Sequence, residues 1–313
     1  MARLALIHDP LFAQHDPGPG HPESAGRMRA VLERLETAGL LAQLPRLEPR
    51  PATTQQLLRV HTQGHIDHVL EYRGRGPAVL DLGDTVISAD SVDAALLAAG
   101  AGVAAVEAVA AGECDRVFCA VRPPGHHARP DSAMGFCLFN NIAVCAAHAL
   151  ASGFERVLIV DWDVHHGNGT QEMFYDSDRV CFLSLHRAAF FPGTGHAHET
   201  GSGPGAGLTV NRPLRAGAGD EVFAGVMQEA LQEIESRFVP DLVLISAGFD
   251  AHAADPVGGM KLSEAGFREM TDEVVRFARR HAEGRVISFL EGGYDHAALA
   301  GSVEAHLLGL LES

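Results

Sequence analysis

Residues 156–171 read RVLIVDWDVHHGNGTQ, and this stretch decides the fold. Its first part, Val157–Val160, is a short apolar run rich in β-branched residues, which is typical of a strand buried on both faces of a parallel sheet. Charged residues begin where that strand is expected to end. Because ligands of open parallel α/β sheets bind beyond the carboxyl ends of the strands, Asp161, Asp163 and His165 are expected at a ligand-binding edge.

Asp163 and His165 are two residues apart, so in extended backbone their side chains leave the same face and can converge on one point. A carboxylate oxygen and a neutral imidazole nitrogen are both ligands of zinc. His166 follows directly, and Gly167 and Gly169 permit tight backbone there. A solvated acidic loop is the simpler interpretation of any one of these residues. For the whole set, directly after a buried strand, the sequence favours a metal site.

Length and composition are typical of a globular α/β protein. The chain has 313 residues, of which 46% are apolar and 20% charged, so a large core is available. One domain over residues 1–313 is predicted, because α/β folds often reach this length around a single core. No apolar stretch is expected to reach the roughly 20 residues of a membrane span. The start, MARLALIHDP, has too short an apolar run for a signal peptide, so no contact with a membrane is expected.

Cysteine usage and charge narrow the compartment and the partners. The 5 cysteines have no close paired spacing, which favours reduced thiols and a cytoplasmic location over a disulfide framework. The formal net charge is -16, from 24 basic and 40 acidic residues. Such a protein repels nucleic acid and favours cationic ligands. We therefore expect no nucleic-acid partner, and the charge weakly favours a basic substrate.

Strands and helices are expected to alternate along the chain. The predicted strands cover 3–8, 115–121, 157–160, 179–185, 208–211, 242–246 and 285–290, and the predicted helices 25–38, 92–111, 140–151, 221–238, 264–281 and 297–311. Residues 73–91 are predicted to form a loop, and the histidines of 61–68 to lie at the surface or at a helix end. Expected N-cap residues are Ser24, Thr53 or Thr54, Asn140 or Asn141, and Ser263. The alternation predicts a three-layer α/β/α fold around a mostly parallel sheet.

Polar groups follow four of the predicted strands. Besides Asp161 to His166 after 157–160, His126 and His127 follow 115–121, Asp250 follows 242–246, and Tyr294 follows the last strand. Histidine can take a proton from water and return one to a leaving amine, and a tyrosine hydroxyl can donate a hydrogen bond to an oxyanion.

A metal would join these groups to the central stretch. Three ligands, Asp163, His165 and Asp250, would leave the fourth position of a tetrahedral zinc ion free for water, as catalytic zinc sites do. Such an ion lowers the pKa of bound water and polarises a carbonyl oxygen. The pattern predicts a metal-assisted amide hydrolase.

Six motifs resemble the zinc-dependent histone deacetylase superfamily, and within it the class II and bacterial amidohydrolase branch. They are RPPGHHA, MGFCLFNN, DWDVHHGNGTQ, FFPGTG, AGFDAHAADP and EGGY, in the order of the family and over almost the whole chain. The resemblance implies the arginase/deacetylase fold and hydrolysis of an acylated amine to acetate and free amine.

The resemblance also implies roles for individual residues. Asp163, His165 and Asp250 would hold one Zn²⁺. His127 would be the general base and His126 its electrostatic partner, with Asp161 orienting His126 and Asn168 orienting His127. An Asn at this position, where class I members have an acid, places the chain on the class II side. Tyr294 matches the catalytic tyrosine, and its presence predicts turnover on acetyl-lysine.

Substrate, acetate and potassium sites are implied in the same way. Gly135, Phe136 and Phe191 resemble the walls of the narrow acyl-lysine tunnel, and Asp84 resembles the rim group that grips the substrate backbone. Arg27, in HPESAGR, matches the arginine near an internal acetate pocket. A structural K⁺ would bind the backbone oxygens of Asp161, Asp163 and His165, together with Ser184 and Leu185.

The leading expectation is a deacylase of Nε-acyl-lysine in proteins or peptides. An acetylpolyamine amidohydrolase shares the motifs, but polyamine-selective eukaryotic relatives carry a Glu where this chain has Val257, which favours lysine. A non-catalytic acyl-lysine binder is opposed by the intact ligands and Tyr294. An arginase-type enzyme would use two manganese ions and more bridging carboxylates. The sequence is compatible with a homo-oligomer, and iron or cobalt suits the same ligands as zinc.

Overall fold

The computed structural model describes residues 3–313, and its centre is a seven-stranded sheet. The strand order is β1-β4-β9-β8-β5-β6-β7, and every neighbouring pair is parallel. The strands are β1 (Leu4–Ile7), β4 (Arg116–Cys119), β5 (Val157–Asp161), β6 (Val180–Arg187), β7 (Thr209–Leu214), β8 (Leu242–Ala247) and β9 (Val286–Leu290). The predicted parallel α/β architecture is confirmed.

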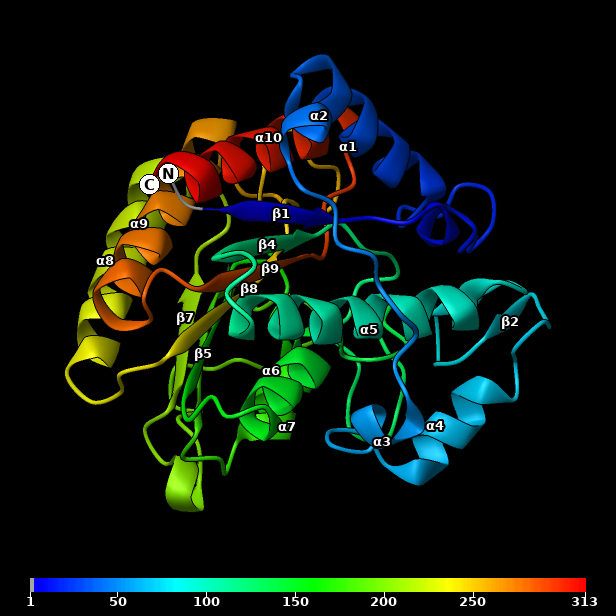
Figure 1. Ribbon diagram of the computed structural model, residues 1–313, viewed down its shortest axis with the longest axis horizontal. Coiled ribbons are helices and arrows are strands. Elements are labelled where there is room, and N and C mark those ends of the chain that lie inside the picture. Colours follow the sequence, from blue (N-terminus) through cyan, green and yellow to red (C-terminus); the bar gives the residue numbers. More distant parts are fainter. Residues whose placement is uncertain (1–2) are drawn as a thin grey trace.

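Helices cover both faces of this sheet (Figure 1). One face carries α1 (Ala25–Thr37), α10 (His296–Glu312), α9 (Glu264–His281) and α8 (Asp220–Glu235), packed side by side in that order. The other carries α5 (Ser91–Ala110), α6 (Asn141–Ala151) and α7 (Asn168–Phe174). Shorter elements are η1 (Pro10–Ala13), α2 (Leu40–Gln43), α3 (Thr54–Leu57), α4 (Gln63–Leu70), β2 (Ala78–Val79), β3 (Val86–Ile87) and η2 (Gly203–Gly205).

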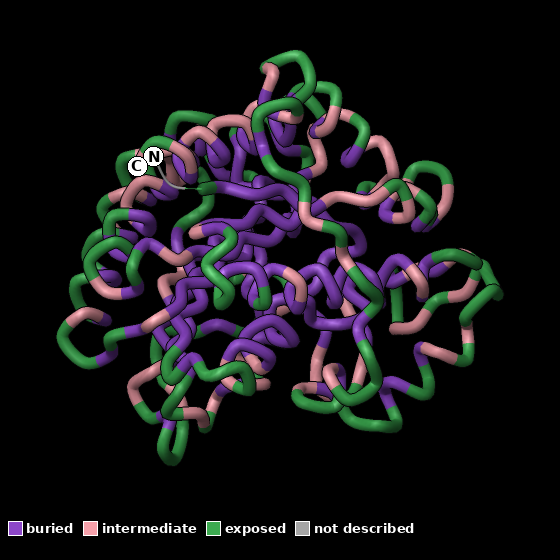
Figure 2. The backbone as a smooth tube through the Cα atoms, in the orientation of Figure 1, coloured by how far each residue is buried: buried purple, intermediate pink, exposed green. Residues whose placement is uncertain are grey.

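The sheet is the buried centre of the molecule, and exposed residues gather in the outer loops and on the outer helix surfaces (Figure 2). Every residue of β5 is buried, as its unbroken apolar run predicts. The expectation that no apolar stretch reaches membrane-span length is wrong for α5. This helix of 20 residues is long and apolar enough, but 83% of its apolar window is buried inside the fold. It is a core helix packed against α6 and β4.

Several short elements were not predicted from the sequence, and two of the segments that contain them carry candidate site residues. The segment 73–91 contains the antiparallel hairpin β2–β3, in which Ala78 pairs with Ile87. The segment after Gly167 forms α7, although Asn168 and Gly169 are weak helix formers. A Cβ atom at Gly169 would lie 2.1 Å from the backbone oxygen of Ala128, so this glycine serves close packing. Tertiary contact therefore outweighs local preference here.

The histidines of 61–68 were predicted to lie at the surface or at a helix end. His61 and His65 lie at the start of α4, but they are buried, so the surface alternative is wrong for these two. His61 contacts both ends of the segment 129–140: its Nδ1 lies 3.0 Å from the Arg129 oxygen, and its Nε2 accepts from the Asn140 amide at 3.0 Å. His65 Nε2 lies 2.9 Å from the Leu138 oxygen. The two rings hold this segment against the α3–α4 region.

Most predicted helix caps are confirmed. Thr53, Asn140 and Ser263 each accept a hydrogen bond from a backbone amide in the first turn of their helix. Ser24 occupies the N-cap position of α1 but makes no such bond. Its hydroxyl lies 3.5 Å from His296 Nε2 instead.

Candidate active site

Four neighbouring strands of the sheet bring the site residues together. β4, β9, β8 and β5 are adjacent and parallel, so their carboxyl ends meet at one edge. The segments that follow them carry His126 and His127, Tyr294, Asp250, and the pair Asp163 and His165. This is the convergence that the motifs predicted, and it lies where parallel sheets bind ligands.

Asp163, His165 and Asp250 form a buried group whose ligand atoms all lie within 4.8 Å of one another. His165 Nδ1 lies 3.1 Å from Asp163 Oδ1 and 3.2 Å from Asp250 Oδ2. The chain bends over residues 163–165 instead of remaining extended, yet both side chains still point to one place. Two carboxylates and one imidazole are a donor set that suits a zinc ion.

Backbone amides hold the two carboxylates in position. Asp163 Oδ2 accepts from the Gly292 amide at 2.8 Å, and Asp250 Oδ1 accepts from the Val164 amide at 2.8 Å. Asp250 Oδ2 is buried and has no hydrogen-bond partner, since its contact with His165 lacks hydrogen-bond geometry. An unpaired buried carboxylate oxygen is costly unless a cation or a proton compensates it. The residues present therefore fit a bound metal ion.

Two glycines leave the space that these carboxylates occupy. A Cβ atom at Gly248 would lie 2.1 Å from Asp163 Oδ2, and one at Gly292 would lie 2.3 Å from Asp250 Oδ2. Any larger residue at either position would displace a carboxylate. Burial and the neighbouring Asp163 carboxylate raise the pKa of Asp250 to about 7, so a positive ion bound between the two carboxylates would be favoured.

His126 is paired with an acid below the cavity. Its Nδ1 lies 3.0 Å from Asp161 Oδ2, and its Nε2 lies 3.8 Å from Asp163 Oδ1. Burial alone would lower the pKa of His126, but the carboxylates of Asp161 and Asp163 outweigh it and raise the pKa to about 10. His126 is therefore the cationic member of the histidine pair in this environment.

His127 is paired with an amide instead. Its Nδ1 lies 2.8 Å from Asn168 Oδ1, which leaves Nε2 as its free nitrogen. Burial, together with the neighbouring His126 and His165 rings, holds the pKa of His127 well below its ordinary value. The rings of His126 and His127 lie 4.0 Å apart, so one positive charge disfavours a second. The pair thus combines a cationic and a neutral imidazole.

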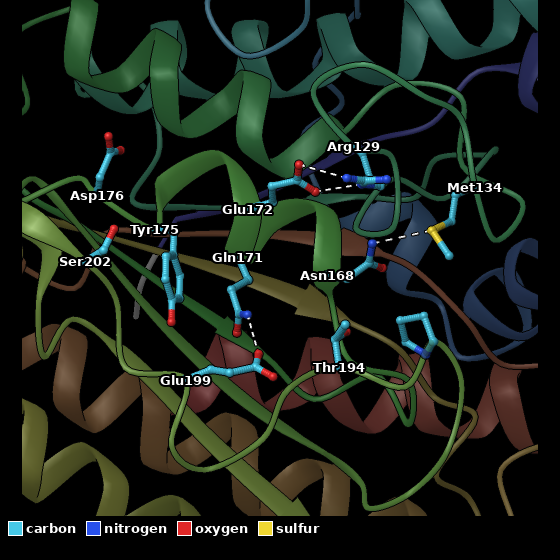
Figure 3. Close-up of a pocket in the computed structure, with 11 residues that line it drawn as sticks. Arg129, Met134, Asn168, Gln171, Glu172, Tyr175, Asp176, Thr194, Glu199 and Ser202 are labelled. Atoms are coloured by element: carbon cyan, nitrogen blue, oxygen red, sulfur yellow. Dashed lines mark hydrogen bonds and ion pairs between the residues drawn. The ribbon is translucent and has the colours of Figure 1, made fainter.

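Asn168 is itself held from its other side. Its Nδ2 donates to Met134 Sδ at 3.4 Å, and Figure 3 shows this contact at one end of an open polar groove of about 790 Å³. Along this groove Arg129 donates twice to Glu172, at 2.7 and 3.0 Å. None of the three possible metal ligands lines this groove. The groove is connected to the catalytic histidines through Asn168, which contacts His127.

Tyr294 stands on the turn after β9 and lines the cavity above the possible ligands. Its backbone amide donates to Asp255 Oδ2 at 2.7 Å, which fixes the turn. Burial and the carboxylates of Asp250 and Asp163 raise the pKa of Tyr294 well above its ordinary value. The phenol therefore keeps its proton and can donate a hydrogen bond.

The cavity has a volume of about 280 Å³ and aromatic walls. Phe190 stacks on the His165 ring with centroids 5.1 Å apart, and the Phe191 ring meets the His127 ring edge-on with centroids 5.1 Å apart.

Phe136 lies across the cavity wall from Tyr294, with ring centroids 6.1 Å apart, and has a φ of 70°, a conformation that costs energy for a bulky residue. A Cβ atom at Gly135 would lie 2.5 Å from the His127 ring. Gly135, Phe136 and Phe191 thus line the cavity, and Asp84 lies at its mouth.

Glu291 was not singled out from the sequence. It is fully buried, and its Oε2 accepts from the Gly125 amide at 2.7 Å and the His126 amide at 3.3 Å. Its Oε1 accepts from the Ser246 hydroxyl at 3.1 Å. Burial raises the pKa of Glu291 to about 7. The first residue of EGGY, an acid directly after a buried strand, was the available signal, and it resembles the position of Asp161.

Arg27 lies in a buried ionic cluster behind Tyr294. It donates to the Gly293 oxygen at 2.6 Å and to the Glu291 oxygen, and its guanidinium lies 5.3 Å from the Tyr294 ring centroid. Glu23 joins it to Arg122, a pairing that the sequence did not predict. Arg27 therefore supports the turn that carries Tyr294.

The residues expected at a potassium site lie at the same edge of the sheet. Asp161 and Ser184 are register partners on β5 and β6, and Leu185 follows Ser184. His166, in contrast, points away from the cavity. Its Nδ1 lies 2.8 Å from Thr194 Oγ1 and its Nε2 2.9 Å from Gln171 Oε1.

Comparison with known proteins agrees with this geometry. A family model described as the histone deacetylase domain matches residues 21–310. A probable deacetylase of Archaeoglobus fulgidus is 40% identical over 291 residues, which are 92% of this chain and 80% of the relative. A histone deacetylase-like amidohydrolase of Pseudomonas aeruginosa is 40% identical over 314 residues, which are 94% of this chain and 82% of the relative.

Plant relatives extend the comparison. Histone deacetylase 5 of Arabidopsis thaliana is 40% identical over 99% of this chain, which spans 49% of that longer protein. A solved structure, the crystal structure of the HDA15 HD domain, superposes with a TM-score of 0.95 and 39% identity, over 99% of this chain and 88% of that one. Sequence and fold therefore agree over nearly the whole length.

Proposed function

The chain belongs to the histone deacetylase family and is a deacetylase of the amidohydrolase type, and from this premise we propose that it removes acetyl groups from Nε-acetyl-lysine of proteins or peptides with one zinc ion. One observation carries the proposal. The three possible metal ligands lie together, and one of them, His165, lines a narrow aromatic cavity together with His126, His127 and Tyr294.

The zinc ion would be held by Asp163, His165 and Asp250. When bound, such an ion polarises the amide carbonyl and makes a water molecule more acidic. Within residues 3–313, one group of His and Asp side chains brings three ligand atoms within 4.8 Å of one another. This supports a single ion over the pair of ions of an arginase-type site. The donor set also supports catalysis over mere binding of the acyl-lysine.

His127 is the proposed general base. Because Asn168 Oδ1 accepts the Nδ1 proton, Nε2 is unprotonated and free to accept a proton from the attacking water. The depressed pKa of His127 keeps it ready for this role at neutral pH. An amide partner provides orientation without the negative charge of an Asp, so it leaves this histidine less basic.

His126 and Tyr294 act on the other charges of the reaction. The His126 imidazolium, paired with Asp161, stabilises the negative charge that develops above it and assists the leaving amine. The Tyr294 hydroxyl donates a hydrogen bond to the carbonyl oxygen as it becomes an oxyanion. Phe136 and Phe191 exclude water from the acyl-lysine side chain, which strengthens both interactions.

The side chain of Val257 supports lysine over polyamine as the substrate class. It lines the cavity, and an apolar residue there offers no charge to the secondary amines of a polyamine. A comparison of acetyl-lysine peptide with acetylspermidine and acetylputrescine tests this choice. We expect kcat/KM to be higher for the peptide, and much faster cleavage of either polyamine would replace the proposal with a polyamine amidohydrolase.

Two further proposals concern a structural potassium ion and the location of the enzyme in the cell. A structural K⁺ at the backbone oxygens of Asp161, Asp163 and His165, with Ser184 and Leu185, would fix the loop after β5. The parallel register of β5 and β6 supports this site. A cytoplasmic location is supported by the 5 cysteines, which are all free and buried.

A further inference from the structure

A second hollow opens beside the mouth of the cavity. Its volume is about 610 Å³, and its apolar lining comes from Leu80, Leu82, Ala133, Met134 and Phe191. Asp84 and Phe191 line both this hollow and the catalytic cavity. A substrate that leaves the cavity between Phe191 and Asp84 therefore reaches this hollow. We name this hollow the mouth groove.

Two exposed apolar side chains meet in the mouth groove. Leu82 has a relative exposure of 109%, higher than any other large apolar residue in the described chain, and Phe191 has 41%. Single exposed apolar residues are ordinary on protein surfaces. Two that line one hollow next to a catalytic cavity are typical of a binding surface.

The wall that carries Leu82 is fixed to the wall of the cavity. Asp81 Oδ1 accepts from the amides of Gly83, Asp84 and Thr85 at 3.0, 2.9 and 3.0 Å. Thr85 Oγ1 donates to Asp81 Oδ2 at 2.5 Å and accepts from the Phe136 amide at 3.1 Å. Thr85 thus connects the tip of the β2–β3 hairpin to the backbone of Phe136, which fixes the position of one relative to the other. Because the groove is formed before binding, its residues lose little conformational entropy when a ligand enters.

We propose that the mouth groove binds a large apolar side chain, Leu or Phe, of the residue next to the acyl-lysine in a peptide substrate. This inference rests on the proposed function. A linear polyamine has no such side chain and gains nothing from the groove. An acidic neighbour is not favoured either, because the one cation lining the groove, Arg129, is already paired through two hydrogen bonds with Glu172.

The test compares acetyl-lysine peptides that differ only in the residue before or after the modified lysine, which is Gly, Leu or Phe. For the unaltered enzyme, kcat/KM should be roughly tenfold higher with Leu or Phe than with Gly on at least one side. In Leu82→Ser this preference should fall to about twofold. The substitution does not threaten folding, because Leu82 is fully exposed.

Val239→Ser is the matched control. Val239 is 49% exposed and precedes β8, so it lies at the opposite end of the sheet from the site. It should keep the full preference for Leu or Phe.

Three results would overturn the inference. One is equal rates on all peptides by the unaltered enzyme, and another is an unchanged preference in Leu82→Ser. The third is a lower molecular mass of Leu82→Ser in light scattering with the preference intact, which would show that a second copy of the chain covers Leu82. If no acetyl-lysine peptide is hydrolysed at all, the proposed function fails as well, so the two failures are distinguishable.

Discussion

Two buried groups of charged side chains differ in how their charge is balanced. The Glu23 carboxylate contacts Arg122 at 2.5 and 2.7 Å and Arg27 at 2.8 Å, and His15 lies 3.2 Å away. Burial alone would raise the pKa of Glu23, but Arg122, His15 and Arg27 hold it well below its ordinary value. In the other group, Asp250 Oδ2 has no hydrogen-bond partner, and Asp163 lies close enough to raise the pKa of Asp250.

The difference separates a structural site from a binding site. Around Glu23 the positive charge of two arginines more than matches the carboxylate, and backbone oxygens of Phe12, His15 and Gly293 accept the remaining donors. Around Asp250 two carboxylates and one imidazole form a donor set that fits a positive metal ion. Breaking a buried ion pair whose charges are matched destabilises the fold. Buried carboxylates whose charges are only partly matched reduce stability, and such a group is typical of a ligand site.

The largest expected effect follows from removing one of the possible metal ligands. In Asp250→Asn the Val164 amide keeps its acceptor, but the second negative charge is lost. We expect zinc content near zero and deacetylase activity lower by about a thousandfold or more, because several kcal/mol of transition-state stabilisation depend on the ion. Without metal, the variant should be at least as stable as the unaltered protein, since a buried negative charge has been removed.

Metal analysis, turnover on acetyl-lysine peptide and thermal unfolding after chelation measure these effects. Asp176→Asn, an exposed acid in the polar groove of Figure 3, is the control and should bind one zinc ion. A variant at Asp250 that retains full zinc occupancy would remove this residue from the ligand set.

The complete group should respond in the opposite way. Glu23→Gln leaves Arg27 and Arg122 buried without their shared carboxylate, which should lower the free energy of unfolding by about 3–5 kcal/mol. Chemical denaturation with and without a chelator tests it. A loss below about 1 kcal/mol would show that the arginines find other partners and that the contrast between the two groups is wrong.

The pH dependence of stability follows from the same carboxylate. Because the pKa of Glu23 is lower in the folded than in the unfolded state, its contribution is fully present above the unfolded value, near pH 4.5. It is lost as the pH falls further, toward the folded value. Between pH 5 and about pH 3 the Glu23→Gln variant should therefore lose less stability than the unaltered protein. Parallel curves for the two proteins would contradict this.

Tyr294→Phe should cost less than loss of a metal ligand. The turn remains fixed by the Asp255 contact with the backbone, so zinc content and melting temperature should not change. Turnover should fall by roughly a hundredfold or more, about 2.7 kcal/mol, as for other lost oxyanion donors. Near-normal kcat with bound zinc would exclude Tyr294 from the mechanism.

The smallest expected effect concerns Glu291, which holds the backbone of the histidine loop. Glu291→Ala removes the acceptor for the Gly125 and His126 amides and should lower kcat by about tenfold. Glu291→Gln keeps an acceptor for both amides, and its new amide group can donate to the Ser246 hydroxyl oxygen, so it should recover most of the rate. Equal losses in the two variants would show that the negative charge of Glu291 matters more than its hydrogen bonds.

The contrast also explains what the sequence could predict. The strand β5 was predictable because its apolar run is unbroken, and the acids and histidines that follow it could be assigned to one edge because parallel strands end together. The resemblance then supplied roles for Asp250 and Tyr294, far away in the chain. The structure places Tyr294 and His127 around one cavity, and Asp250 beside His165, which lines the same cavity.

The rest depended on partners that local patterns do not show. Arg122 and Glu23 are 99 residues apart, and nothing near either one indicates that they pair. His61 was predicted to lie at the surface or at a helix end, because the segment 61–68 is polar, yet it is buried by contact with both ends of 129–140. The helix α7 begins with two weak helix formers, Asn168 and Gly169, and Gly169 packs closely against Ala128. In each case, tertiary contact decided what local preference left open.

The position of the bound zinc ion is the most direct test of the central claim. Anomalous diffraction at the zinc edge, from crystals of the zinc-loaded protein, would locate it. The expected result is one peak per chain, about 2.0–2.2 Å from the Asp163 and Asp250 carboxylates and from His165 Nδ1. A peak elsewhere, or two peaks of equal height at this site, would contradict the account.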